Sequence, residues 1–527
     1  MKPQDYNISS EKFKFRTKDV NLHDTKLETK PVSYFKDALH RFTKNKASIV
    51  AAGIIGLLVL FAIFAPLFTP YTVSYSDTTY KYVLPKNELF YNLRLGFWDG
   101  CKTRTMNKID YDLLRAIEEE LSGEEKFEVI RSEVKEVETT SLSGKTKVMY
   151  KMRVDTYNVV GVTYQLMTPE QFQTIQEYQN ETGIQIIYPI TVESKRPEAQ
   201  QDNSNANYWF LTEKVNEKTS IVFDENGNFI PIYQEYQKDE NGNYIVSDGY
   251  NSKRVPGDNG QYAYGIVKQG GTLQTRVNYR EYYIYMHTRV YNDGITEPSF
   301  LFGTNQAGKD LFVGLASGAR FSLILAVIVA SINLFVGAIY GAIEGYYGGV
   351  VDLVMERFCD ILGSIPFMIV ISLLKYHLKA SHILILFISF FLTGWMGMAG
   401  STRMQFYRFK NQEYVLVART LGANDRRIMF KHIFPNAIGT LITRCVLVIP
   451  SVIFSETSLT YLNIINLESG KMTSVGTLLS QGQDHLYTYP HMLLFPALFI
   501  SLLMLSFNLF GNGLRDAFNP SLRGTEE

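Results

Sequence analysis

Two long runs without a charged residue constrain this chain more than any other feature of its sequence. The first covers residues 47–68 and the second covers residues 321–343. A helix rises 1.5 Å per residue, so each run is roughly 33 Å long and crosses a hydrocarbon core about 30 Å thick. The sequence therefore predicts a protein that spans a membrane.

Four weaker apolar segments bring the predicted number of spanning helices to six. They lie at about residues 358–374, 382–402, 437–455 and 490–510. Pro366 predicts a kink in the first of these segments, because proline removes a backbone donor inside a helix. Asp360 and Arg444 are the acidic and basic residues in the four segments, and both are expected near helix ends.

Basic residues predict the orientation, because they resist translocation and stay in the cytoplasm. They are concentrated in a leader, residues 1–46, and in a loop, residues 403–436. Six crossings place both segments in the cytoplasm, together with a tail at residues 513–527. The first transmembrane helix is expected at residues 47–70 and the remaining helices form a permease core at residues 301–512. The acidic loop after the second run does not follow the rule.

A polar, tyrosine-rich segment separates the two strongest runs. Residues 71–300 are predicted to form an α+β domain on the outer face. Helices are expected at residues 109–121 and after Thr168, which precedes a proline at the first helical position. Alternating polarity predicts strands at residues 147–154 and 185–192.

Two short motifs in this segment favour turns over ligand sites. Asn226-Gly227 and Asn241-Gly242 lie in similar contexts, and Asn-Gly between apolar runs is typical of a hairpin. A calcium loop is the alternative, but the twelve-residue loop ending in a ligating glutamate is absent. Residues 143–146, Ser-Gly-Lys-Thr, resemble the end of a phosphate-binding loop, but Thr139 stands where its leading glycine belongs, so a hairpin turn is predicted.

Other chemistry finds little support in the sequence. The net charge is zero, which implies no nucleic-acid partner. The three cysteines lie in separate segments and lack the spacing of a zinc site or a disulfide framework. No catalytic signature is evident, so the chain is not expected to be an enzyme, to hold a metal or to bind a cofactor of its own.

The basic loop has the pattern of a helical elbow. Residues 412–421 are predicted to form a short helix, and Gly422 suits the left-handed position after its end. Asn424 or Asp425 is expected to cap a second helix that runs toward the membrane. Small residues beside Gly422, Ala418 and Ala423, suit contact with a partner's groove. An amphipathic linker with its basic residues on lipid headgroups remains the alternative.

Residues 413–436 resemble the permease signature of ABC importers, in the version of the C-type oligopeptide and dipeptide permeases. Val417 and Ala418 stand for the two alanines of the signature, Gly422 matches its glycine, and Phe434-Pro435 match its closing pair. Leu416 replaces a glutamate. The resemblance implies a coupling helix that docks on an ATPase, with these site residues: Glu413, Tyr414, Val417, Ala418, Arg419, Gly422, Ala423, Asp425, Arg426 and Pro435.

Two further stretches, residues 302–323 and 508–517, are similar to motifs of the same family. The positions that match lie before the second helix, after the fifth and near the end of the chain: Gly303, Thr304, Gly308, Asp310, Gly318, Arg320, Ser322, Glu456, Gly511, Arg515 and Asp516. Asn305, Lys309, Val313 and Gly314 depart from the pattern. The resemblance covers the first span and residues from about 300 onward, and leaves the insertion out.

The resemblance implies a six-helix, type I importer permease in the cell membrane, with an oligopeptide as cargo. Its implied partners are a second permease, two ATPases that bind ATP and magnesium, and an extracytoplasmic peptide-binding protein, lipid-anchored where there is no outer membrane. Dipeptides or a metal chelate are alternative cargoes, and a secondary transporter or a membrane-anchored receptor is an alternative class. The insertion is expected to receive the binding protein or to contact peptide, and the third to sixth helices to line the pathway.

Overall fold

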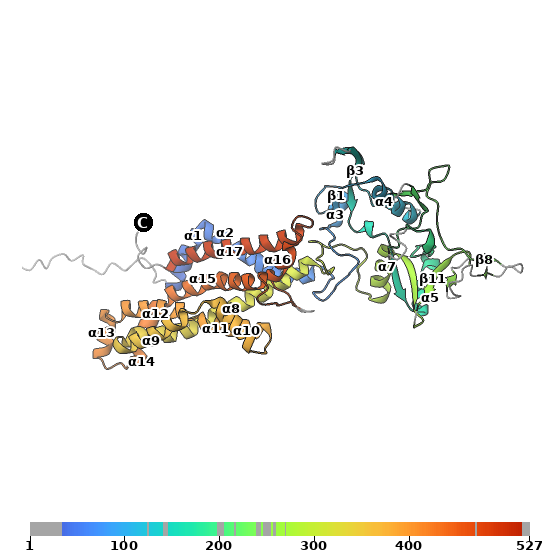
Figure 1. Cartoon of the computed structure of the whole chain (residues 1–527). Coiled ribbons are helices and arrows are strands. Elements are labelled where there is room, and N and C mark those ends of the chain that lie inside the picture. Colours follow the sequence, from blue (N-terminus) through green and yellow to red (C-terminus); the bar gives the residue numbers. More distant parts are fainter. Residues whose placement is uncertain are drawn as a thin grey trace, which may run out of the picture.

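The computed structural model describes residues 34–123, 126–140, 146–197, 205–215, 218–238, 244–245, 254–256, 260–268, 270–468 and 472–518. It is elongated, with a helical bundle at one end and a mixed helix and sheet insertion at the other (Figure 1). The two chain ends of the described part, α1 (Tyr34–Lys44) and the end of α17 (His491–Phe518), lie at the bundle end.

Within the described residues, five helical runs are long and apolar enough to cross a membrane, and a bent pair of helices makes a sixth. The five runs are α2 (Lys46–Phe64) with a 3-10 turn η2 (Ala65–Leu67), α8 (Leu311–Tyr347), α11 (His382–Thr393) with α12 (Met396–Phe409), the run from α14 (Asp425–Arg427) through α15 (Phe434–Tyr461), and α17. The prediction of a polytopic helical membrane protein is confirmed.

The bent pair is where the third span was predicted. It consists of α9 (Gly349–Gly363) and α10 (Phe367–His377), which meet at an angle of 72°. Pro366 is the residue before α10, and its backbone has no N–H to continue the α9 hydrogen-bond ladder. The predicted kink at Pro366 is therefore confirmed.

Several helices extend beyond their predicted ends. α8 begins at Leu311, so Gly318 and Arg320 lie inside it and not before it. α15 continues to Tyr461 and includes Glu456, and α17 continues to Phe518, past residue 513 where the tail was predicted to begin. A charge-free window marks only the part of a helix in hydrocarbon, whereas backbone hydrogen bonds continue the helix past the apolar segment.

Glycines on one stripe of α8 let α12 pack closely against it. Gly337, Gly341 and Gly345 recur every fourth residue and face α12. A Cβ at Gly337 would lie 2.7 Å from the carbonyl oxygen of Trp395, and one at Gly341 would overlap the carbonyl of Ala399. Small residues at this spacing let two membrane helices approach closely, where lipid supplies no hydrophobic driving force between them.

The described part of the insertion contains several small antiparallel sheets and four helices. A three-stranded sheet has the order β1-β3-β2, and a five-stranded sheet has the order β10-β11-β12-β4 with β5 also on β12. The strands of these sheets are β1 (Cys101–Met106), β2 (Lys135–Thr140), β3 (Thr146–Asp155), β4 (Val162–Met167), β5 (Ile187–Tyr188), β10 (Arg254–Pro256), β11 (Ala263–Val267) and β12 (Leu273–Asn278). Two further pairs are β6 (Thr212–Val215) with β7 (Lys218–Ile221) and β8 (Gln237–Lys238) with β9 (Tyr244–Ile245).

The helices of the insertion are α3 (Glu88–Asn92), α4 (Lys108–Leu121), α5 (Pro169–Thr182) and α7 (Tyr279–Tyr285), the last continued by a π-helical turn η5 (Met286–Val290). Short 3-10 turns η3 (Asn158–Val160) and η4 (Glu193–Lys195) connect other elements. Both predicted helices are confirmed, and Thr168 forms a capping box with Gln171. Of the two predicted strands, the first is β3, and the second is reduced to β5.

Of the three motifs predicted as turns, one lies within the described residues. Gly227 has φ of +82° and the Asp224 side chain accepts hydrogen bonds from the backbone of Asn226 and Asn228, so the first Asn-Gly turn is confirmed. Residues 239–243 and 141–145 lie outside the described residues, although the strands that flank each of them pair.

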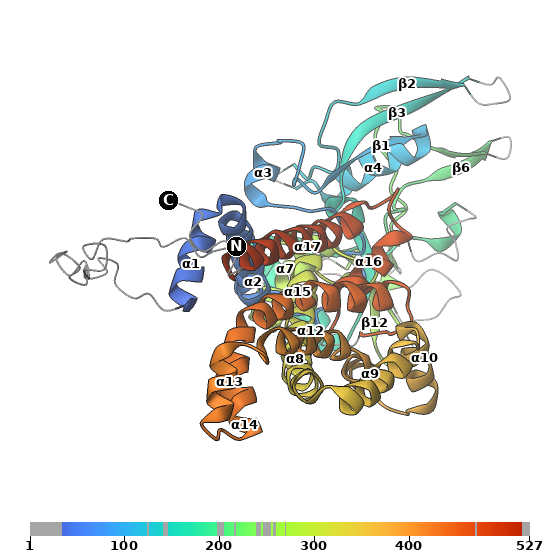
Figure 2. The same cartoon turned by 90° about the vertical axis from the view of Figure 1, so that its left-hand side faces the viewer.

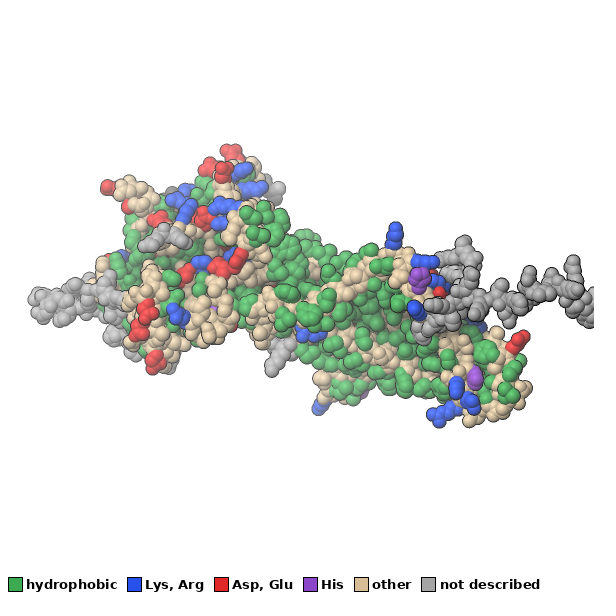
Figure 3. Space-filling model, turned by 180° about the vertical axis from the view of Figure 1, so that it is seen from behind, with side chains coloured by type: hydrophobic (Ala, Val, Ile, Leu, Met, Phe, Trp, Pro, Cys, Tyr) green, Lys and Arg blue, Asp and Glu red, His purple; other side chains and the backbone are tan. Residues whose placement is uncertain are grey.

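Apolar side chains cover the middle of the helical bundle (Figure 3). Charged side chains gather on the insertion and on the tip of the bundle that lies farthest from the insertion. Figure 2 shows α13 (Glu413–Thr420) and α1 at the edge of the bundle, away from the body of the insertion. This distribution leaves one belt of the molecule suited to lipid.

Candidate functional site: a helical elbow at the tip of the bundle

The predicted elbow forms between α12 and α15. α13 is followed by Gly422 with φ of +83°, and Asn424 caps α14 by accepting a 2.9 Å hydrogen bond from the backbone N–H of Arg427. A π-helical turn, η6 (Ile428–Ile433), then joins α14 to α15. The predicted helix, its glycine and its cap are thus confirmed, and most of the loop predicted at residues 403–436 is helical.

The inner face of the elbow is packed against the bundle. Val415 of α13 and Ile428 and Ile433 of η6 are fully buried. They belong to one apolar cluster with Tyr346 of α8 and Phe406 of α12. The elbow is therefore fixed to the ends of two spanning helices by the burial of its own side chains.

The outer face of α13 is apolar and exposed. Leu416, Val417 and Leu421 are 45%, 56% and 82% exposed. Ala418, by contrast, is buried, and Ala423 is half-buried. The outward surface of the elbow is therefore formed mainly by larger side chains, and contact of the two alanines with a partner stays a prediction.

A hydrogen bond joins the elbow to the second spanning helix. The hydroxyl of Tyr346, in the last turn of α8, donates to Asp425 Oδ1 at 2.6 Å. The guanidinium of Arg419 lies over the Tyr346 ring, 5.9 Å from its centre. The other elbow residues predicted as site positions are exposed: Glu413, Tyr414, Arg426 and Pro435.

The motif before α8 lies at the junction of bundle and insertion. Gly303 and Gly308 have φ of +75° and +70°, and a Cβ at Gly308 would overlap the carbonyl of Asp77. The buried Thr304 hydroxyl donates to the carbonyl of Tyr80 at 2.6 Å. Asp310 caps α8 by accepting from the Phe312 N–H at 2.9 Å, and burial raises the pKa of its carboxyl to about 7. These positions hold the start of α8 against the segment that leaves α2.

The remaining motif positions tie spanning helices together. Arg320 Nε donates to the Ala62 carbonyl of α2 at 3.0 Å, and the Ser322 hydroxyl donates to buried Glu456 Oε2 of α15 at 2.7 Å. Gly318 lies against the backbone before α16 (Val475–Gln483), and Gly511 lies against Leu447.

Arg515 lies beside a cavity of about 470 Å³ between α12, α15 and α17, together with Arg408 and Arg444. Asp516, in the last helical turn of α17, is exposed. Arg444 lies in the interior of α15 and not near a helix end as predicted, because α15 is longer than its charge-free segments.

Sequence reasoning missed one network near the elbow. Arg403 of α12 donates to Asp352 at 2.6 and 2.8 Å and to Glu356 at 2.7 and 2.8 Å, both on α9. Its Nε also lies 3.5 Å from Glu344 of α8. The acidic loop that did not follow the charge rule is therefore paired with a basic residue from the next span. Only the fold brings these charges together, so spacing in the sequence gave no signal.

Comparison with known proteins identifies the bundle. A family model described as "Binding-protein-dependent transport system inner membrane component" matches residues 333–524, and one described as "N-terminal TM domain of oligopeptide transport permease C" matches residues 33–85. The oligopeptide transport system permease protein OppC of Bacillus subtilis is 42% identical over 222 residues, which are 42% of this chain and 72% of that protein. The chain belongs to the binding-protein-dependent transport permeases.

Other relatives agree with this family. OppC of Haemophilus influenzae is 40% identical over a segment that makes up 42% of this chain and 70% of that protein. The dipeptide transport system permease protein DppC of Bacillus subtilis is 38% identical over a segment that makes up 42% of this chain and 69% of that protein. The permease is a transport subunit of an ABC system, in which the ATPase is a separate subunit. Most of the insertion, from residue 86 onward, lies between the two segments that the family models match.

Proposed function

We propose that this permease forms half of the translocation pathway of an ATP-driven importer of oligopeptides. It pairs with a second permease, two ATPases bind beneath it with ATP and magnesium, and an extracytoplasmic binding protein delivers the peptide. Relatives named for oligopeptide and dipeptide transport support this cargo class. The chain itself needs no cofactor for this role.

The observation that carries the proposal is the two-faced elbow at α13. Its inner face is locked into the bundle by Val415, and its outer face presents Val417 and Leu421 to the surroundings. Burying such a patch in a partner stabilises the contact by about 25 cal/mol per Å² of apolar surface. A rigid elbow with an unpartnered apolar face suits an ATPase that pushes on the bundle.

Orientation follows from the same elbow. The basic tip of the bundle carries Arg419, Arg426, Arg427 and Lys431, all exposed, whereas the insertion lies at the opposite end (Figure 1). The rule for basic residues favours the cytoplasm for the tip and for both chain ends, and the outer face for the insertion at residues 71–300.

Motion reaches the pathway through contacts that the elbow makes with α8 and α15. Movement of the elbow is transmitted to α8 through the bond between Tyr346 and Asp425 of α14, and to α15 through η6. Two packed arrangements of the bundle, open to either side, then alternate with the state of the ATPases.

Substitution of the outer face tests the proposal. Leu421→Glu places a charge on the proposed docking surface without touching the core, and we expect ATPase subunits to be lost from the purified complex and uptake of labelled peptide to stop. Leu39→Glu is the matched control, since Leu39 of α1 is 64% exposed at the same end of the molecule. Retention of both ATPases and of uptake in Leu421→Glu would refute the docking role.

A further inference from the structure

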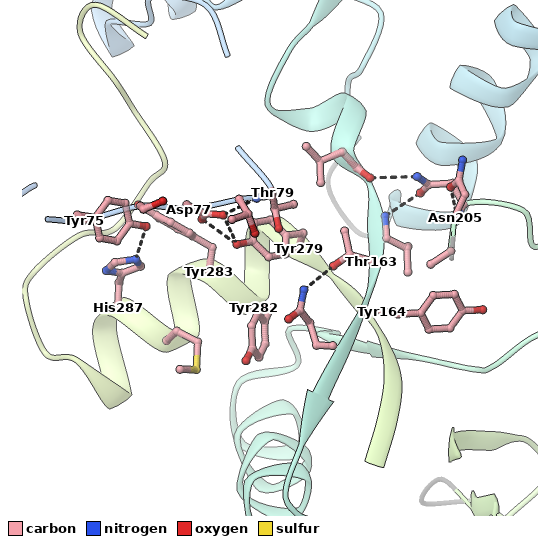
Figure 4. Close-up of a pocket in the computed structure, with 18 of the residues that line it drawn as sticks. Tyr75, Asp77, Thr79, Thr163, Tyr164, Asn205, Tyr279, Tyr282, Tyr283 and His287 are labelled. Atoms are coloured by element: carbon pink, nitrogen blue, oxygen red, sulfur yellow. Dashed lines mark hydrogen bonds between the residues drawn. The ribbon is translucent and has the colours of Figure 1, made fainter. Parts of the chain in front are cut away.

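A cavity of about 700 Å³ lies inside the insertion, well away from the elbow. Its walls come from the segment at residues 75–79, from β4 and from α7 (Figure 4). Its volume falls in the range of pockets that hold small ligands, roughly 300–1,000 Å³. One family model reaches residue 85 and includes the wall at residues 75–79, whereas neither model covers α7, β4 or residues 205–207.

In the part of the chain that the structure describes, the strand that lines the cavity is an edge strand with no strand on its outer side. β4 pairs with β12, and Asn278 faces Val162 in that pairing. The Asn278 N–H donates to the Ile186 carbonyl, on the side of β12 that faces away from β4. Asn278 and Val162 therefore form a non-hydrogen-bonded pair, in which the N–H and C=O of each residue point away from the other strand. The same alternation directs the N–H and C=O of Tyr164 and Leu166 to the open edge. Among the described residues, neither of these two has a backbone partner there.

The first position of this edge is already occupied by an amide from the protein. The Asn207 side chain accepts a 2.7 Å hydrogen bond from the Val162 N–H and donates to the Val160 carbonyl at 3.0 Å. A carboxamide has the same donor and acceptor groups as a peptide bond. Asn207 therefore pairs with β4 in the way that a peptide backbone would, and the next two positions of the edge continue into the cavity and beyond it.

The wall opposite β4 is built from tyrosines of α7. Tyr279 donates to both oxygens of Asp77 at 2.7 Å, and Tyr283 donates to Tyr71 at 3.0 Å. Burial raises the pKa of Tyr279 and Tyr283, which keeps both hydroxyls protonated as donors at neutral pH. The hydroxyl of Tyr282 has no hydrogen-bond partner among the described residues and its ring faces the cavity (Figure 4).

The lining of the cavity selects against charged ligands. Among the described residues, no lysine or arginine lines it, and the one carboxylate in that lining, Asp77, is engaged by Tyr279. An aromatic wall, neutral polar side chains and an open strand edge together match an extended polypeptide, since main-chain pairing supplies affinity regardless of side-chain sequence.

We infer that this cavity binds a short extended peptide, whose backbone pairs with Tyr164 and Leu166 on the open edge of β4. That this peptide is cargo rests on the proposed function. The outward N–H of Val162 is taken by Asn207, so the pairing runs from Tyr164 to Leu166 and occupies about three residues of a ligand.

The site is connected to the first motif of the permease core. The Ser76 hydroxyl donates to the Ala307 carbonyl at 2.5 Å, and the Asp77 N–H donates to the Gly308 carbonyl at 3.1 Å. Both acceptors lie in the turn that precedes α8. A peptide in the cavity thus contacts a wall that is bonded directly to the start of a spanning helix.

A proline at Leu166 tests the pairing. Leu166 is 66% exposed and its N–H points to the open edge, so Leu166→Pro removes the outward donor and leaves the β12 ladder intact. Leu166→Ala is the matched control, which trims the side chain and keeps the N–H. Binding of fluorescein-labelled tetraalanine is measured on the full-length permease in nanodiscs, without binding protein. We expect saturable binding to wild type and to Leu166→Ala, and affinity about five- to tenfold weaker in Leu166→Pro, the worth of one backbone hydrogen bond.

Hydrogen exchange on the wild-type chain gives a second, independent readout. Saturating tetraalanine is expected to slow exchange at Tyr164 and Leu166 and to leave exchange in β2, one of the two edge strands of the three-stranded sheet, unchanged. The inference is overturned if no saturable binding occurs, if the proline and alanine variants bind equally, or if β4 is not protected. If tetraalanine does not bind but the complex takes up peptide normally, the inference about the cavity fails and the proposed function stands. If tetraalanine binds but the complex takes up no peptide, the proposed function fails and the peptide site stands.

Discussion

The Tyr346 hydroxyl and the Asp425 carboxylate are 2.6 Å apart and connect the end of one spanning helix to the elbow that begins another. A hydrogen bond to a charged group contributes about 1.5–3 kcal/mol when buried, and less here because Asp425 is exposed. We expect Tyr346→Phe to weaken coupling, measured as a rise in ATP hydrolysed per peptide imported by the reconstituted complex. Tyr347→Phe is the control, since the neighbouring Tyr347 hydroxyl has no hydrogen-bond partner in the described residues and is 52% exposed. Equal effects of the two changes would deny this bond a role in coupling.

The left-handed backbone at Gly422 gives a second prediction. A Cβ there meets no atom within 4 Å, but φ of +83° strains any other residue. Gly422→Ala should therefore reduce uptake by distorting the elbow, with a cost of about 1–2 kcal/mol. At Gly400, inside α12, a Cβ also meets open space, and φ is not positive. Gly400→Ala should leave uptake intact, and similar losses in both variants would contradict the conformational argument.

The network around Arg403 predicts a stability effect. Arg403→Gln leaves Asp352, Glu356 and Glu344 without their shared cation, and we expect a lower thermal midpoint of the purified permease, equivalent to about 1.5–3 kcal/mol. The control is Arg408→Gln on the same helix, because within the described residues Arg408 has no carboxylate partner. An unchanged midpoint in Arg403→Gln would show that the network adds nothing to folding.

Close packing at the junction predicts a sharp contrast between two glycines. Gly308 and Gly294 both have positive φ, of +70° and +79°. A Cβ overlaps the Asp77 carbonyl at Gly308 and meets nothing within 4 Å at Gly294. Gly308→Ala should therefore separate the insertion from the start of α8, seen as faster proteolysis after residue 70, whereas Gly294→Ala should not. Equal rates of digestion in the two variants would show that the overlap with the Asp77 carbonyl adds nothing to the effect of backbone strain.

The pKa of Asp310 predicts a pH dependence. Burial raises the pKa of this carboxyl to about 7 in the folded chain, against a usual value near 4. Between these values the folded state holds a proton that the unfolded state has lost, so this group favours folding below about pH 4 and its contribution falls as pH rises to 7. Asp310→Asn keeps the cap of α8 and removes the titration. The decline of the thermal midpoint from pH 5 to pH 8 should be smaller in the variant, and identical slopes would contradict the prediction.

Local sequence signals predicted much of the structure of the elbow. Gly422 and Asn424 act through their own backbone and side-chain geometry, which depends on few neighbours. The kink at Pro366 and the capping box at Thr168 were predictable for the same reason. Helix ends were not, because α8 and α17 continue past the hydrocarbon, where polarity no longer marks their limits.

The sequence by itself determined the spans, the elbow and the motifs that connect the chain to a transport family. The tertiary structure alone decided that Ala418 faces inward, that Arg403 pairs with acids from two other helices, and that β4 has an open edge beside a tyrosine wall. The physical reason is the distance along the chain over which each feature is encoded. Hydrophobic runs, caps and turns are encoded within one helical turn or so, whereas burial, ion pairing and strand edges depend on which distant segments the fold brings into contact.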